Sequence, residues 1–338
     1  MLLKLKPSKV QQKTRVNPGH HMSVSEFSLI NEFFTDTATF GLTPVIGIGD
    51  DCAILDIPSD QQLAVSTDTL VDGVHFLSDS DPCYLGHKVL AVNLSDLAAM
   101  GATPAWATLS ITLPEMDAPW LRSFSQSFFA LAKSHALRLI GGDTTRGPLS
   151  ITLTVMGLLP KNKRLSRSTA QLGDGIYLSG NVGNAGVGLQ KAKMGFSDIA
   201  DHDLACYLKP TPRVALGQLL LERATSCIDV SDGLSADLSH VLRASGVGAT
   251  IEQQLLPLTE SVRQQMVLLD DPLWPCSTGD DYELCFTLPA GAAPPSADEL
   301  QGLSISKIGV IEQNLGLRVS LPNGDIWPLD KGYDHFNE

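Results

Sequence analysis

The sequence predicts an α+β protein built from two domains. Residues 107–113 and 151–155 alternate apolar and polar side chains with a period of two, which is typical of strands that have one half-exposed face. Sheets with a polar face indicate α+β architecture, because a parallel sheet covered by helices on both faces would be apolar throughout. The length of 338 residues favours two domains over one.

The first 22 residues differ in character from the rest of the chain. They are basic, contain two prolines, and show little apolar periodicity, so we expect 1–22 to be a disordered extension. A helix is predicted from Ser23, because 23–26 resembles a capping box and Phe27, Ile30, Phe33 and Phe34 follow at helical spacing.

Further elements follow from local patterns. A strand is expected at 63–65, where it leads into Ser66-Thr67-Asp68. A helix is expected at 82–100, and Gly101 is the residue expected to end it.

A polar and basic stretch near 161–168 separates the two halves of the chain. We therefore place an N-terminal domain at 23–165 and a C-terminal domain at 166–338.

Composition excludes several functional classes. The formal net charge of −13 argues against general binding of nucleic acids or anionic membranes, although metal ions can still recruit phosphate ligands. None of the six cysteines forms a Cys-x-x-Cys pair, which argues against zinc-ribbon and thioredoxin sites, and we interpret Cys52 and Cys285 as packing residues. No secretory signal or membrane-spanning apolar run is visible, so we expect a cytoplasmic protein.

Aspartates follow several of the predicted strands. The set comprises Asp50, Asp51, Asp68, Asp143, Asp229 and Asp232, and Asp96 joins it from the predicted helix. A single aspartate in such a place usually forms a turn or caps a helix. If several converge, however, their carboxylates repel one another and need cations. Oxygen ligands of this kind suit magnesium, which often shares the phosphate oxygens of a substrate.

No P-loop or protein-kinase motif occurs in the chain. A glycine-rich run at 180–188 follows a strand-like segment, and three interpretations of it stay open. It could form a tight turn, bind phosphate through backbone amides at a helix start, or belong to a dinucleotide site with unusual spacing.

Four basic side chains lie near these motifs: Lys88, Arg146, Arg167 and Arg213. Arginine suits phosphate recognition, but taken singly each of the four is interpreted as a solvated surface charge. Arg146 has the most suggestive position, three residues after Asp143. A histidine beside a phenylalanine, such as His75, more often packs in a core than binds a ligand.

Together these segments resemble the thiamine-monophosphate kinase family, within the larger group of aminoimidazole ribonucleotide synthetase-like ATP enzymes. The resemblance runs from about Glu26 to Phe336 and rests on the order and spacing of several motifs. They are GIGDDCA, STDTLVDGVHF, NLSDLAAMGATP, GGDTTRGP, IDVSDGLSADL, GDDYELCF and KGYDHF.

The resemblance implies a homodimer in which the N-terminal domains pair their sheets and a smaller α/β C-terminal domain completes each site. It implies that magnesium is bound by Asp51, Ser66, Thr67, Asp68, Asp96, Asp143, Asp229 and Asp232. It implies ATP contacts from Gly142, Asp143, Arg167 and Ser231. Thiamine monophosphate would be held by His75, Asp280 and Tyr333, and similar sequences usually have glutamate where Asp280 stands.

The implied reaction is phosphorylation of thiamine monophosphate to thiamine diphosphate by ATP, with Asp143 and Arg146 as the expected catalytic residues. The acceptor is already a phosphate, so no strong general base is needed, and we expect direct transfer supported by magnesium. Two alternatives stay open at this point: an aminoimidazole ribonucleotide synthetase-like ATP ligase and a non-catalytic nucleotide-binding regulator.

Overall fold

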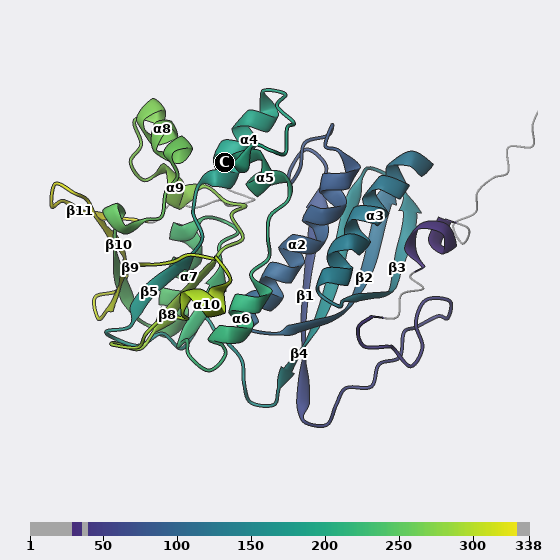
Figure 1. The fold of residues 1–338 in the computed structure, drawn as a ribbon, viewed down its shortest axis with the longest axis horizontal. Coiled ribbons are helices and arrows are strands. Elements are labelled where there is room, and N and C mark those ends of the chain that lie inside the picture. The colour runs from purple at the N-terminus through teal and green to yellow at the C-terminus, as the bar shows by residue number, and fades with distance from the viewer. Residues whose placement is uncertain (1–28, 36–39, 330–338) are drawn as a thin grey trace, which may run out of the picture.

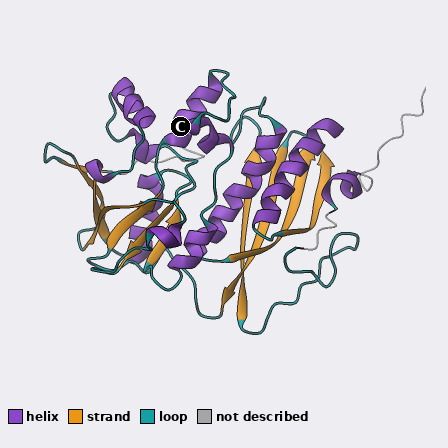
Figure 2. Cartoon of the chain, viewed as in Figure 1, coloured by secondary structure: helices purple, strands orange, loops and turns teal. Residues whose placement is uncertain are grey.

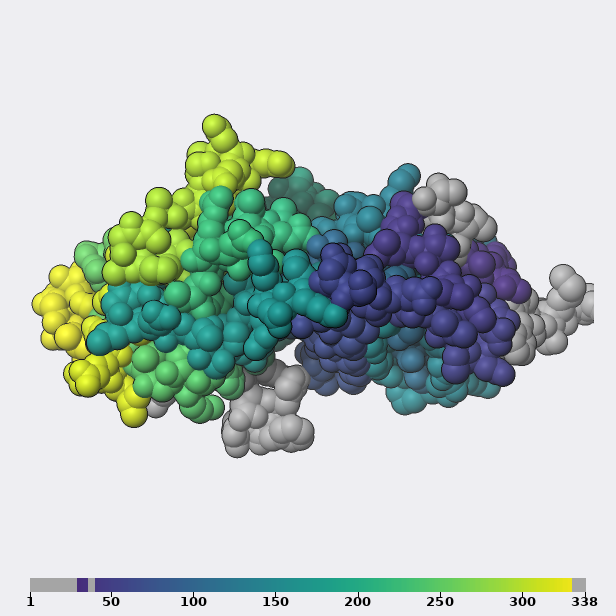
Figure 3. All heavy atoms as spheres, turned by 90° about the horizontal axis from the view of Figure 1, so that it is seen from below, coloured from purple at the N-terminus to yellow at the C-terminus, as the bar shows by residue number. Residues whose placement is uncertain are grey.

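The computed structural model describes residues 29–35 and 40–329, which form two parts that lie side by side (Figures 1 and 3). One part contains a four-stranded sheet and the other a seven-stranded sheet. Each sheet mixes parallel and antiparallel pairs, which confirms the α+β prediction. The extension predicted at 1–22 and the predicted helix start at Ser23 lie outside the described residues. Within the described ranges, no helix is long and apolar enough to cross a membrane.

The four-stranded sheet has the strand order β1-β4-β2-β3. Its strands are β1 (Gln61–Val71), β2 (Thr103–Leu113), β3 (Arg138–Arg146) and β4 (Ser150–Pro160). Strands β2 and β3 are parallel, whereas β4 is antiparallel to both of its neighbours. Helices α2 (Pro82–Met100) and α3 (Ala118–Ser134) cover one face of the sheet (Figure 2), and the π-helical turn η1 (Ile30–Phe34) lies against α3.

The alternation predicted for these strands is present. In β2, Leu109 and Ile111 are buried toward the helices. On the opposite face, hydroxyl groups pair across β1 and β4, with 2.9 Å between the Oγ1 atoms of Thr67 and Thr154. That face also carries exposed apolar side chains of β1, namely Leu63, Val65 and Val71. We call the face of the sheet that α2 and α3 leave uncovered the open face.

Helix α2 occupies 82–100, as predicted, because both of its ends are capped locally. The Asp81 carboxylate accepts the Cys83 amide at 2.8 Å, and Pro82 stands in the first turn, where its missing N–H costs nothing. Gly101 ends the helix in the left-handed conformation at φ 74°.

The seven-stranded sheet has the order β11-β10-β7-β9-β5-β8-β6. Its strands are β5 (Gly175–Ser179), β6 (Ser226–Asp229), β7 (Gly248–Glu252), β8 (Leu284–Leu288), β9 (Ile305–Glu312), β10 (Gly316–Ser320) and β11 (Ile326–Pro328). The helices of this part are α4 (Asn184–Lys193), α5 (His202–Leu208), α6 (Val214–Leu220), α7 (Leu234–Ser245), η2 (Gln253–Leu255), α8 (Glu260–Leu269), α9 (Trp274–Ser277) and α10 (Ala297–Leu300).

The two parts share an apolar core at their junction. Buried side chains of α2 and α6 belong to the same cluster as Leu284 and Phe286 of β8. Helix α6 packs so closely on α2 that a Cβ atom at Gly217 would lie 2.0 Å from the carbonyl oxygen of Ala98. The predicted boundary at 165/166 falls in the connection between β4 and β5, and it stays a prediction.

Two predictions about local structure are wrong. Asp68 and Asp143 were expected in turns after strands, but both lie inside strands, β1 and β3. The predicted strand 63–65 extends to Val71 because β1 pairs with β4 along its whole length. Pairing over long sequence separation, which a local pattern does not contain, therefore sets the end of β1.

Candidate active-site clefts

A cleft of about 820 Å³ lies between the two parts of the chain. Its walls come from β1, α2, α4, α9 and the loops around 231 and 280. Most of the residues predicted for the site line it directly: Thr67, Asp68, His75, Asp96, Asp229, Ser231, Asp232 and Asp280. We call this the acidic cleft.

Three different elements bring the aspartates of the acidic cleft together. Asp68 comes from β1, Asp96 from α2, and Asp229 from the last position of β6. The Ser66 hydroxyl donates to Asp96 Oδ2 at 2.5 Å, and the Asp68 amide donates to Asn93 Oδ1 at 3.2 Å. These bonds link β1 to α2, the two elements that carry Asp68 and Asp96.

The carboxylates of the acidic cleft are crowded and poorly solvated. Burial, with added repulsion from Asp96 and Asp232, raises the pKa of Asp68 to about 6. Burial and the charge of Asp96 raise the pKa of Asp229 to about 7. Burial also raises the pKa of Asp96, although its bond from Ser66 and the Arg167 charge oppose this. The cleft therefore favours cationic ligands, which would relieve this repulsion.

The donor set of the acidic cleft fits magnesium. In the described part of the chain, no three His, Cys, Asp or Glu side chains form a compact metal-binding group. Magnesium, however, usually takes only one or two carboxylates and completes its octahedron with waters and substrate phosphates. Asp68, Asp96, Asp229 and Asp232 supply oxygen ligands suited to that mode.

Asp237 supports the cleft and was missed by the sequence analysis. Its Oδ2 accepts the backbone amides of Ser231 and Asp232, both at 3.0 Å, which shapes the loop after β6. Burial, followed by repulsion from Asp229 and Asp232, raises the pKa of Asp237 to about 8. The sequence signal for Asp237 was its place as an acidic residue in the first turn of α7, four residues after the Gly233 N-cap.

Lys88 was interpreted as a surface charge, and this interpretation is wrong. Its side chain is buried, and its Nζ lies 2.8 Å from Asp280 Oδ2. The Tyr282 hydroxyl donates to Asp280 Oδ1 at 3.0 Å. Asp280 therefore reaches the acidic cleft with each carboxylate oxygen already bonded to one protein group.

Arg213 was also expected at the surface and instead forms a mostly buried ion pair. Its guanidinium donates to both carboxylate oxygens of Glu283, with Nε 2.7 Å from Oε2. The interpretation of Arg213 as a solvated charge is therefore wrong.

The other two arginines differ in their surroundings. Arg167 is exposed as expected, but its charge acts on Asp96 and Asp229 of the acidic cleft. Arg146 is exposed as well, and its Nε donates to the carbonyl of Pro114 at 3.2 Å.

Asp51, Gly142 and Asp143 line a second cleft, of about 730 Å³. The structure thus does not bring Asp51 and Asp143 into the acidic cleft. Gly142 has φ 152°, and a Cβ atom there would lie 1.8 Å from the carbonyl oxygen of Leu109, so only glycine fits. Arg146 lines neither cleft.

The expectations for four further residues have different outcomes. His75 is half-exposed and lines the acidic cleft, with its Nδ1 accepting the Val71 amide at 3.0 Å, so the core interpretation is wrong. Cys52 is exposed at the second cleft, so its interpretation as a packing residue is wrong, whereas Cys285 is buried as expected. Tyr333 lies outside the described residues.

The glycine-rich run forms a tight turn at the start of α4. Gly183 is the N-cap with φ 88°, and the Asp281 carboxylate accepts the amides of Gly183 at 2.8 Å and Ala185 at 3.3 Å. A protein carboxylate thus occupies the position that a phosphate would take at this helix N-terminus. This arrangement favours the turn interpretation over phosphate contact.

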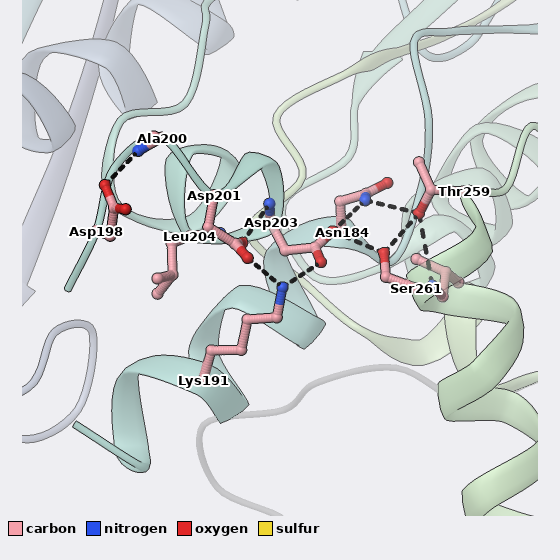
Figure 4. Close-up of polar contacts among 10 residues, drawn as sticks. Asn184, Lys191, Asp198, Ala200, Asp201, Asp203, Leu204, Thr259 and Ser261 are labelled. Atoms are coloured by element: carbon pink, nitrogen blue, oxygen red, sulfur yellow. Dashed lines mark hydrogen bonds and ion pairs between the residues drawn. The ribbon is translucent and has the colours of Figure 1, made fainter. Parts of the chain in front are cut away.

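A polar network holds α4, one wall of the acidic cleft, against α5 and α8 (Figure 4). The Lys191 Nζ lies 2.6 Å from Asp201 Oδ2 and 2.8 Å from Asp203 Oδ2. The Asn184 side-chain amide donates to Asp203 Oδ1 at 2.5 Å and to Thr259 Oγ1 at 2.8 Å. These bonds fix the α4 wall of the cleft in place.

Comparisons with known proteins identify relatives of this chain. Residues 49–159 match the family described as AIR synthase related protein, N-terminal domain. The thiamine-monophosphate kinase of Escherichia coli O157:H7 is 46% identical over 323 residues, which cover 93% of this chain and 99% of the relative.

The chain is also similar to solved structures of such kinases. The thiamine-monophosphate kinase of Stenotrophomonas maltophilia K279a has a TM-score of 0.75 at 42% identity, covering 83% of this chain and 92% of that one. The structure of AaThiL complexed with AMPPCP and TMP has a TM-score of 0.73 at 26% identity, covering 95% of this chain and all of the other. This chain belongs to the thiamine-monophosphate kinase family.

Proposed function

We propose that this chain transfers the γ-phosphoryl group of ATP to the phosphate of thiamine monophosphate, giving thiamine diphosphate and ADP. Family membership supports the activity, and the complex of AaThiL with AMPPCP and TMP supports the two substrates. The observation that carries the proposal is the acidic cleft, where five aspartates from both parts of the chain face one space.

In the proposed reaction, an oxygen of the acceptor phosphate attacks the γ-phosphorus of ATP while the bond to the β,γ-bridging oxygen breaks. The nucleophile is already ionised, so the chain has no proton to remove from it. Its task is to bring two polyanions together in line. Magnesium, when bound, supplies positive charge that offsets the repulsion between them.

The residues of the acidic cleft are proposed to divide this task. Asp68, Asp96, Asp229 and Asp232 would hold magnesium. The Ser66 hydroxyl orients the Asp96 carboxylate, and the bond from the Asp68 amide to Asn93 holds the β1 backbone at Asp68 against α2. Thr67, which lines this cleft, and Ser66, whose hydroxyl donates to Asp96, are both kept as proposed ligands. Asp51 and Asp143, in the second cleft, are proposed to act in the same site when two chains associate.

The remaining assignments concern the substrates. We propose that Gly142, Asp143, Arg167 and Ser231 contact ATP, and that His75, Asp280 and Tyr333 contact thiamine monophosphate. Asp143 and Arg146 are kept as the proposed catalytic residues, although Arg146 lines neither cleft.

We also propose a homodimer that forms through the open face. This face exposes the apolar side chains of Leu63, Val65 and Val71, which a partner sheet would cover. We propose a cytoplasmic location, which suits the free thiols of all six cysteines.

One assay tests the activity. The full chain is incubated with magnesium, ATP and either thiamine monophosphate or thiamine, and the products are separated by chromatography. We expect thiamine diphosphate and ADP from the monophosphate, and negligible product from thiamine, whose neutral hydroxyl would need a base. Comparable turnover of both acceptors would contradict the mechanism, and nucleotide binding without any product would favour a regulator.

A further inference from the structure

Lys88 joins three elements at the edge of the acidic cleft. It lies on α2 eight residues before Asp96, with Val92 midway, so all three share one face of the helix. Val92 and Asp96 line the cleft directly. Lys88 is only 4% exposed, and its Nζ lies between Asp280 Oδ2, at 2.8 Å, and the ring of Tyr207 in α5, 4.0 Å from the centroid.

The loop that carries Asp280 adopts an unusual backbone conformation. Asp280 has φ 69° and Tyr282 has φ 50°, in the left-handed region that bulky residues rarely adopt. Their amides donate to the carbonyls of Ser231 and Val230, both at 2.8 Å. Such a conformation persists only where surrounding contacts hold it, and here it directs the loop toward the cleft.

Lys88 supplies a charged contact that ties this loop to the other part of the chain. Tyr282 belongs to the loop itself, and burial raises the pKa of its hydroxyl, which keeps it a neutral donor to Asp280. The Lys88 ammonium is the charged partner of Asp280, and it comes from the helix that carries Asp96. The ion pair thus fixes the position of Asp280 relative to Asp96.

We propose that Lys88 is a positioning residue for phosphoryl transfer, which fixes the 278–282 loop so that the Asp280 carboxylate is oriented toward bound thiamine monophosphate. The inference rests on the proposed function, in which Asp280 contacts that acceptor. Lys88 itself does not line the cleft, so it acts through Asp280.

The test replaces Lys88 with methionine in the full chain and measures KM for both substrates. We expect Lys88→Met to raise KM for thiamine monophosphate at least about tenfold, while KM for ATP stays within about twofold. Arg213→Met is the matched control, because it breaks another mostly buried ion pair, to Glu283, at a residue outside both clefts. It is expected to lower Tm without changing KM for thiamine monophosphate.

A double-mutant cycle with Asp280→Asn separates positioning from general stability. If Lys88 acts through Asp280, the double variant has the same KM for thiamine monophosphate as Asp280→Asn alone, within about twofold. The double variant also removes both charges, so it leaves no unpaired buried ion and can be measured even if Lys88→Met does not fold. A KM for thiamine monophosphate well above that of Asp280→Asn alone would then show that Lys88 does not act through Asp280, and would overturn the inference.

The outcomes distinguish the inference from the function on which it rests. If Asp280→Asn raises KM for thiamine monophosphate and Lys88→Met does not, Lys88 is not a positioning residue and the proposed function stands. If neither variant raises KM for thiamine monophosphate, while thiamine diphosphate is still formed, the assignment of Asp280 to the acceptor is wrong. The inference about Lys88 is then wrong as well. An equal rise in the Arg213→Met control would also overturn the inference.

Discussion

Asp68 and Asp229 lie in surroundings that oppose their own ionisation. Burial raises the pKa of both, and neighbouring carboxylates add to the effect. The sequence predicted an aspartate-rich site because the motifs carry these residues, but it misassigned Lys88. The partner of Lys88, Asp280, is 192 residues away in the sequence, and no local pattern indicates that the two side chains are in contact.

The first prediction concerns pH and magnesium. The folded-state pKa values of about 6 for Asp68 and about 7 for Asp229 lie above that of an unfolded aspartate, so the folded chain holds protons that the unfolded chain has released. These groups therefore make stability fall as pH rises from about 4 to about 7. We expect Tm in chelator to fall over this range, and magnesium to raise Tm more at high pH.

Thermal unfolding with and without magnesium, at constant ionic strength, measures this effect. Asp68→Asn should weaken the pH dependence, whereas Asp60→Asn, at an exposed position before β1, should not. A magnesium effect that is equal at low and high pH would contradict the assignment of these carboxylates as ligands.

The second prediction concerns Asp96. Asp96→Asn keeps the shape of the side chain and an acceptor for Ser66, but it removes the charge from the centre of the cluster. We expect kcat/KM to fall at least about tenfold, which corresponds to about 1.4 kcal/mol of lost transition-state stabilisation, with the circular dichroism unchanged. Normal activity at limiting magnesium would show that Asp96 is not a ligand.

At the scale of single helices and strands, the sequence correctly predicted the features that residues within the same segment determine. The ends of α2 were predicted correctly because Asp81, Pro82 and Gly101 cap it within the segment itself. The glycine-rich run could not be assigned, because its partner, Asp281, lies 98 residues beyond Gly183 in the chain. The extent of β1 was missed for the same reason, since β4 supplies its hydrogen bonds.

The third prediction tests the start of α4. Asp281→Ala would leave the amides of Gly183 and Ala185 without their acceptor, which should cost about 2 kcal/mol of unfolding free energy. Urea denaturation measures this loss. Because a protein carboxylate fills the helix start, we expect KM for ATP to stay unchanged. A raised KM for ATP without loss of stability would instead indicate that the glycine-rich run contacts phosphate.

At the scale of the whole molecule, the predicted site is divided between two clefts. Asp68 and Asp96 line one, while Asp51 and Asp143 line the other. The sequence predicted the set of residues, but it contained no information on which of them a single chain brings together. The open face, with its apolar β1 side chains, gives a physical reason to expect association of two chains.

The last prediction tests that association. Val65 is 59% exposed on β1, between Leu63 and Thr67 on the open face, so Val65→Lys would place a charge in the proposed interface without disturbing the core. We expect the variant to have the mass of one chain in light scattering, and the unmodified protein that of two. Leu268→Lys is the control, because Leu268 is 76% exposed on α8 and should not affect association. Loss of activity in the Val65 variant alone would support a site completed by pairing, whereas a dimer that withstands Val65→Lys would place the interface elsewhere.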